Sequence, residues 1–211
     1  MNNQDNKNRS LLSTLLEKSF ELWVRNRCNS IEKLKVIIIG ENNELFKGSI
    51  REITLNAKRI NFMGLDFKSA NIKSGSIKIK LNPLSTKKKI KIMEEFIING
   101  EIVIGQSELT SLFNSSSWKW LKIIIEKELF SGEIITGIEI DKNIVSFILL
   151  NKENNIKTTI DTHIKSYKKS ILISSQNKDY LLPMDQAISI KEIKFNTNNM
   201  SIEANAIIYP D

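Results

Sequence analysis

The strongest constraint on the fold of this chain is an alternation of apolar and polar residues with a period of two. The clearest example is the stretch IKIKL at 77–81, and Leu34 and Val36 alternate with Lys33 and Lys35 in the same way. Successive side chains of a β-strand point to opposite faces, so this pattern is typical of a strand with one buried face. The alternation therefore predicts that much of the chain is β-sheet.

Short turns rich in asparagine separate the predicted strands, for example at Asn154-Asn155 and Asn198-Asn199. Asparagine tolerates the left-handed backbone that tight hairpins require. Strands joined by such short turns are antiparallel, because parallel neighbours need a long crossover. The amino half is predicted to be extended between 31 and 62, apart from a turn at 40–43, with further strands at 77–81 and 96–104. In the carboxyl half we expect strands at 133–140, 143–151, 156–164, 169–175, 188–195 and 200–208.

Two regions show a helical period instead. Residues 11–27 predict an amphipathic helix, with Ser10 as its N-cap and its leucines, Phe20 and Trp23 on one arc. Residues 107–113, with Ser107 as N-cap, and 118–130 predict a central helical segment. The predicted fold is α+β: a curved, meandering antiparallel sheet packed against the amino-terminal helix and the central segment. Residues 1–9 are predicted to be disordered, and 10–211 to form one domain.

Several strands are apolar on both faces, for example at 37–39, 97–98, 134–135 and 171–173. A sheet with two apolar faces needs cover on both, and only two or three helices are predicted. The pattern leaves three solutions open: a sheet curved around a helix, a second sheet layer, or an apolar groove that another molecule fills.

The residues that carry most enzyme chemistry are scarce. The 211 residues include one cysteine, Cys28, and one histidine, His163, which cannot form a disulfide or a zinc cluster. No glycine pair has the spacing of a phosphate-binding loop, and no Gly-x-Ser-x-Gly elbow is present. We therefore predict a protein that is not an enzyme, with no metal and no cofactor.

Charge and hydropathy limit the partners. The 31 basic and 24 acidic residues give a net charge of +7, but only five of the bases are arginine, so nucleic acid is not an expected partner. Apolar runs reach only about four residues, too short for a membrane-spanning helix. The leucines of 11–16 are interrupted by polar residues, so no signal peptide is expected. The expected location is cytoplasmic. Two interpretations of the first helix stay open: Glu17 and Glu21 favour packing on the sheet, and the alternative is a peripheral position on the inner face of a membrane.

The order of several segments resembles the LmeA-like phospholipid-binding proteins, in particular their cyanobacterial branch. The resemblance covers about 20–211 and rests on soft motifs in a consistent order. They are a Leu-Trp-x-Arg element at 22–25, a Gly-Leu step at 63–67, a strand with a basic segment at 77–91, a degenerate strand-to-helix signature at 104–110, and a closing pair of strands at 188–209. The acid that the family pattern has after Glu108 is replaced here by Leu109 and Thr110.

The resemblance implies a non-catalytic phospholipid-binding protein at a membrane surface. We expect acyl chains to lie in an apolar groove between helix and sheet, with the headgroup at the basic run that begins at Lys87. The candidate lipid contacts are Leu12, Leu16, Phe20, Trp23, Trp120 and Ile124, and the candidate headgroup contacts are Lys87, Lys88 and Lys89. The alternative is a non-enzymatic scaffold or assembly protein whose apolar face binds a partner protein.

Overall fold

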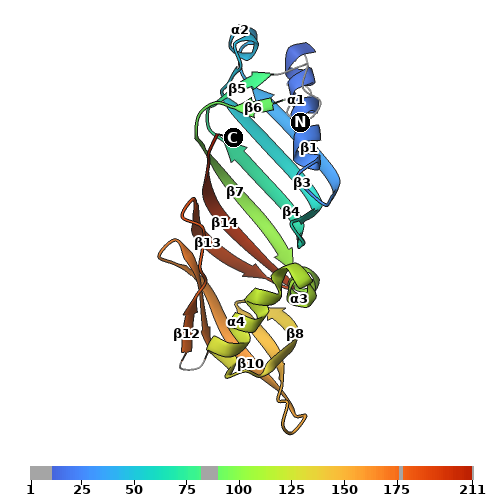
Figure 1. The fold of residues 1–211 in the computed structure, drawn as a ribbon, viewed down its shortest axis with the longest axis vertical. Coiled ribbons are helices and arrows are strands. Elements are labelled where there is room, and N and C mark those ends of the chain that lie inside the picture. Colours follow the sequence, from blue (N-terminus) through green and yellow to red (C-terminus); the bar gives the residue numbers. More distant parts are fainter. Residues whose placement is uncertain (1–10, 82–89, 176–177, 211) are drawn as a thin grey trace.

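The computed structural model describes residues 11–81, 90–175 and 178–210, and these residues form antiparallel sheets with a few helices (Figure 1). The largest sheet has six strands in the order β1 (Ser30–Ile39), β3 (Glu52–Phe62), β4 (Leu65–Ser74), β7 (Phe96–Gly105), β14 (Asn199–Ile208) and β13 (Ile188–Asn196). Every neighbouring pair in it is antiparallel. The sheet joins strands from both halves of the chain, because β14 pairs with β7.

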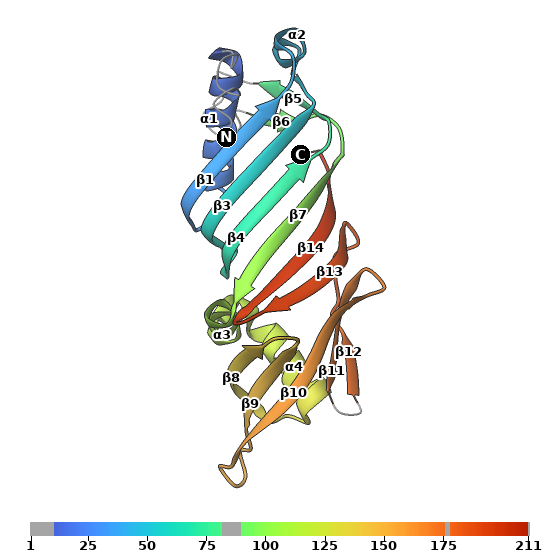
Figure 2. The ribbon, with the colours of Figure 1, turned by 180° about the vertical axis from the view of Figure 1, so that it is seen from behind.

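The strand register gives the six-stranded sheet one apolar and one polar face. Leu55 of β3 pairs with Ile72 of β4, which pairs with Gly100 of β7, which pairs with Ala204 of β14. The neighbouring row on the other face carries lysine, asparagine, serine and glutamate. The apolar face lies on the side of α1 (Leu11–Arg25), and Figure 2 shows the polar face from behind, with α1 beyond the sheet.

One end of the apolar face is covered by α1 and by a small sheet of β2 (Ser49–Ile50), β5 (Ile77–Leu81) and β6 (Ile90–Ile92), beside α2 (Asn42–Phe46). Together they bury a group of apolar side chains that we call the amino-terminal cluster. Its members are Leu16, Phe20, Val36, Ile38, Leu45, Ile50, Ile53, Ile77, Ile79 and Ile90.

The other end of the apolar face meets a five-stranded sheet in the order β12 (Lys178–Leu181), β11 (Ser170–Ser175), β10 (Lys157–Tyr167), β9 (Ile144–Leu150) and β8 (Ile134–Asp141). Helices α3 (Gln106–Asn114) and α4 (Lys119–Phe130), with the 3-10 turn η1 (Ser116–Trp118), pack onto it. Phe147 lies at the centre of this second core, with its ring 5.1 Å from that of Phe130 and 5.9 Å from that of Phe113.

The outer edges of both large sheets are protected by side chains from helices. The buried carboxylate of Glu17 in α1 accepts a hydrogen bond from the backbone N–H of Ile38 in β1 (3.1 Å). In β8, the N–H of Ile135 donates to Glu126 Oε1 (2.8 Å) and the N–H of Ile140 donates to Gln106 Oε1 (3.1 Å). An edge strand with free N–H groups is a template for aggregation, and these contacts remove part of that template.

The α+β class and the antiparallel pairing predicted from the sequence are confirmed. The prediction of a single meandering sheet is wrong, because the described strands form three sheets, of six, five and three strands. Residues 42–46 form α2 where a turn and a strand were expected, and α3 is preceded by Gly105 rather than capped by Ser107. The first helix ends at Arg25 rather than at 27. The expected disorder of 1–9 and the Ser10 cap lie outside the described residues.

The stretches that were predicted to be apolar and covered on both faces differ in how far their side chains are buried. Ile38 is buried but Ile39 is 49% exposed, and Ile97 is 52% exposed beside the half-buried Ile98. In the six-stranded sheet, therefore, Ile39 and Ile97 lie on the face that is open to solvent, and no second layer of described residues covers them. In β11, by contrast, Leu172 and Ile173 are both buried.

Candidate functional site

Helix α1 presents apolar side chains to two different surroundings. On its inner face, Leu16 and Phe20 are buried in the amino-terminal cluster. Its outer face carries Leu11, Leu15 and Leu22, which are 92%, 64% and 48% exposed. At about 100° per residue these three leucines fall within about 40° of one another, so they form one stripe. The sheet thus buries only half of the apolar arc that the sequence predicts for this helix.

The four predicted lipid contacts in α1 are not equally accessible. The side chains of Leu16 and Phe20 are covered by other residues of the amino-terminal cluster. Leu12 and Trp23 are half-buried at the border of the same cluster. The Trp23 ring lies edge-on to Phe20 (6.2 Å between centroids), and the Arg27 guanidinium sits 4.3 Å from the Trp23 ring centroid. Only Leu12 and Trp23 remain able to contact a ligand.

The remaining predicted contacts lie elsewhere. Trp120, which is 46% exposed, and Ile124, which is half-buried, belong to α4, on the opposite end of the molecule from the inner face of α1 (Figure 1). The structure does not bring these two residues together with those of α1, so no groove is lined by both helices. The predicted headgroup contacts Lys87, Lys88 and Lys89 lie outside the described residues.

The middle of the apolar face of the six-stranded sheet is only partly covered. The row Leu55, Ile72, Gly100 and Ala204 is half-buried along its whole length. On the next rows of the same face, Ile98 and Ile102 of β7 are half-buried as well. We call these six residues the central strip.

The cover near the central strip is thin. The small cluster beside it has only three buried members, Ala57, Ile60 and Ala70, and two of these are alanines. Helix α1 contacts β1 and β6 on one side, and α3 contacts the start of β4 and the end of β7 on the other side (Figure 1). The strip therefore lies between two sealed cores and keeps part of its apolar surface in contact with solvent.

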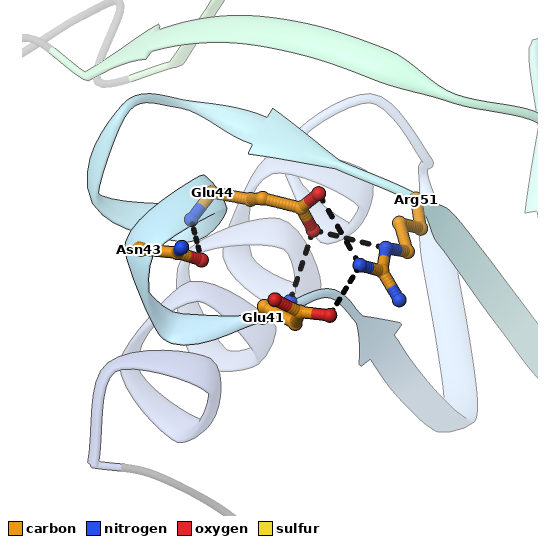
Figure 3. Close-up of polar contacts among 4 residues, drawn as sticks. All are labelled: Glu41, Asn43, Glu44 and Arg51. Atoms are coloured by element: carbon orange, nitrogen blue, oxygen red, sulfur yellow. Dashed lines mark hydrogen bonds and ion pairs between the residues drawn. The ribbon is translucent and has the colours of Figure 1, made fainter.

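The tip formed by α2 is held by a charged cluster (Figure 3). Glu44 accepts a hydrogen bond from the backbone N–H of Glu41 (3.2 Å), and Arg51 bridges Glu41 and Glu44. The bond from the Glu41 N–H, followed by Arg51, lowers the pKa of the Glu44 carboxyl, and the two carboxylates raise the pKa of Arg51. Next to this anchor, Phe46 is 78% exposed.

The polar face contains a hollow of about 380 Å³, on the side of the sheet away from the central strip. Lys33 and Lys35 of β1 and Lys58 of β3 line it, with amide and hydroxyl side chains from the neighbouring strands. A second hollow, of about 350 Å³, lies near the start of β4, and its Asp66 accepts hydrogen bonds from Asn61 (2.6 Å) and Ser111 (3.4 Å).

The described residues offer little for metal or acid–base chemistry. Among them, no group of three or more histidine, cysteine, aspartate or glutamate side chains could hold a metal ion. His163 is exposed on β10. Burial raises the pKa of the Cys28 thiol, which disfavours the reactive thiolate. Of the helices in these residues, none has both the length and the apolar character needed to cross a bilayer.

The central strip was not among the residues predicted from the sequence. A local signal exists, because Ala70 and Ile72 alternate with Ser69, Asn71 and Lys73. That signal places these residues on one face of a strand but does not say whether the face is covered. Comparisons with protein-family models, curated proteins and solved structures give no match for this chain.

Proposed function

We propose that the protein binds phospholipid without catalysis, with an acyl chain lying along the central strip. The observation that carries this proposal is the half-buried row Leu55, Ile72, Gly100 and Ala204, which crosses four strands between two sealed cores. Half-buried apolar surface of this kind gains free energy when a hydrocarbon covers it.

The dimensions of the strip suit an acyl chain. Four strands about 4.8 Å apart span about 14 Å. One leaflet of a bilayer is about 15 Å of hydrocarbon, half of the core thickness. Gly100 and Ala204 present little or no side chain to the apolar face, while Leu55 and Ile72 provide an apolar wall. Burial of a chain contributes about 0.8 kcal/mol per methylene, so no special side chain is needed to hold it.

The outer stripe of α1 supports action at a membrane surface. Leu11 and Leu15 are among the most exposed large apolar side chains of the described residues. Phe46 is another, and it belongs to α2, a helix that contacts α1. An amphipathic helix with free leucines can lie in the headgroup region of a bilayer. We expect a lipid that enters from the membrane to contact Leu12 and Trp23, which are half-buried at the border of the amino-terminal cluster.

The experiment compares two adjacent isoleucines on opposite faces of β7. The protein is purified without detergent, and bound lipid is measured by organic extraction and mass spectrometry. We expect the wild type and Ile97→Asn to carry phospholipid, and Ile98→Asn to carry at least about tenfold less, because an amide in the strip loses its water without a hydrogen-bonding partner. Ile97, on the polar face, is the matched control.

A second variant tests occupancy without a polar group. Ala204→Phe fills the strip with the protein's own side chain and is expected to reduce bound lipid while the protein stays folded, as judged by circular dichroism. Wild-type protein free of lipid, or equal lipid content in all variants, contradicts the proposal. A lipid-free protein that carries a specific protein partner in native mass spectrometry supports the scaffold alternative instead.

A further inference from the structure

The lysines on the polar face of the six-stranded sheet occur in two settings. Towards the β13 edge and on β4 they have acidic neighbours: Lys194 lies 2.7 Å from Glu192, Lys191 lies 3.8 Å from Glu203, and Lys73 lies 2.8 Å from Glu52. Three lysines of this face are thus paired with acidic side chains.

The lysines at the corner formed by β1 and β3 are not paired in this way with any acidic side chain that the structure describes. Lys33 is the direct cross-strand partner of Lys58, and Lys35 follows on the same face of β1. Within the described part of the chain, none of these three ammonium groups has an ion pair or a hydrogen bond. Like charges directly opposite each other in a sheet are destabilising. Three positive charges without an acidic partner among the described residues are therefore gathered at this corner, and two of them lie directly opposite each other.

This lysine corner (Lys33, Lys35 and Lys58) borders the hollow of about 380 Å³, a volume in the range of small-ligand sites. Ser69, Asn56 and Asn71 add hydroxyl and amide groups to its lining. Glu101 is the one carboxylate among the described lining residues, and it is occupied on its far side. It accepts a hydrogen bond from Ser201 of β14. Glu192 is the main cause of the raised pKa of Lys194, and the charges of Glu203 and Glu101 add to its effect.

We infer that the lysine corner binds an anion with two or more negative charges carried by phosphate groups. Lysine ammonium groups bind phosphate as point charges, and neutral amide and hydroxyl donors complete the contacts to the phosphate oxygens. Two sources share this chemistry: a soluble diphosphate, and the phosphate headgroup of an anionic lipid. The site goes beyond the proposed function, because it lies on the face opposite the central strip.

The test uses pairs of variants with equal loss of charge on the same face. Calorimetric titration with sodium pyrophosphate is done on the wild type, on Lys33→Gln/Lys58→Gln and on Lys191→Gln/Lys194→Gln. We expect the first pair to weaken binding at least about tenfold, because two charge-assisted contacts are lost, and the second pair to weaken it less than about twofold. A second arm measures co-sedimentation of the same three proteins with phosphatidylcholine vesicles that contain cardiolipin, whose headgroup carries two phosphates.

Pyrophosphate binding that depends on Lys33 and Lys58 supports a site for a soluble diphosphate. Vesicle binding alone, with the same dependence, supports a lipid headgroup. Equal losses in the two double variants, or no binding in either arm, overturn the inference. The result is independent of the lipid content of the purified protein, which Ile98→Asn changes and the lysine variants should leave unchanged.

Discussion

Two regions on the same apolar face of the six-stranded sheet end up in different states. In the amino-terminal cluster, Ile38 and Ile53 are buried under α1 and the small sheet. Leu55, two residues after Ile53 on β3, stays half-buried, and so does its partner Ile72 on β4. The side chains are of the same kind, so what differs is the cover. An apolar side chain in a sheet is part of the core only where another element reaches it.

The difference teaches where a ligand can act. The amino-terminal cluster is complete, and its residues stabilise the fold. The central strip is incomplete, and covering it would remove further apolar area from water at about 25 cal/mol per Å². A ligand that covers the strip therefore also stabilises the protein.

The largest contrast is expected from trimming one isoleucine in each region. Ile38→Ala in the amino-terminal cluster should lower the free energy of unfolding by about 2–5 kcal/mol, because it leaves a cavity. Ile72→Ala in the central strip should cost only about 1 kcal/mol, because solvent already reaches this side chain. Urea unfolding of lipid-free protein measures both, and equal losses would show that the strip is as well packed as the cluster.

Two glycines provide the next contrast. Gly48, beside α2, has φ +76°, and a Cβ there would collide with the carbonyl oxygen of Ile79, so Gly48→Ala should cost more than about 2 kcal/mol. Gly100 lies in the central strip, where an added Cβ would meet the Ile72 side chain at 3.2 Å. Gly100→Ala should be tolerated within about 1 kcal/mol, since a flexible side chain can yield. Similar unfolding midpoints for both variants would refute this contrast.

The protected edge of β1 predicts an effect of intermediate size. Glu17→Ala removes the acceptor for the Ile38 N–H and should lower stability by about 1–3 kcal/mol. Glu17→Gln keeps an oxygen at the same place and is the control. Hydrogen exchange at the Ile38 amide should become faster in the alanine variant, and unchanged exchange would contradict the edge role of Glu17.

Replacing a lysine of the polar face should change stability by a smaller amount, and the sign should depend on whether the lysine faces another lysine or an acidic partner. Lys58→Gln relieves the repulsion from Lys33 and should raise stability by a few tenths of a kcal/mol at most, on the scale of cross-strand pairs. Lys73→Gln breaks the pair with Glu52 and should lower stability by a similar amount. Thermal unfolding at low ionic strength compares the two, and high salt should reduce both differences.

The smallest effect concerns pH. The Glu44 carboxyl has a lowered pKa in the folded protein, so its contribution is present above the unfolded pKa, about 4.3, and is lost as the pH falls through the lower folded value. Glu44→Gln should therefore narrow the difference in urea midpoint between pH 6 and pH 3 slightly. An identical pH dependence in the variant would show that Arg51 and Glu44 do not support α2.

Much of the local structure follows from the sequence alone. Alternation and asparagine turns predict most strands of the carboxyl half to within a residue or two, and the central helical segment agrees closely with α3 and α4. These features depend on neighbours in the chain. The short helix α2 escapes prediction, because five residues carry too little helical periodicity, and it is held by Arg51 from outside the helix.

The sequence by itself determined that this chain forms antiparallel strands and an amphipathic first helix, because these depend on residues two to four positions apart. Only the tertiary structure decided which apolar residues are covered. Leu55, Ile72, Gly100 and Ala204 form one row because β4 pairs with β7 and β7 pairs with β14, contacts between residues up to about a hundred positions apart along the chain. The same long-range pairing places α1 and α3 on either side of that row and leaves it open between them.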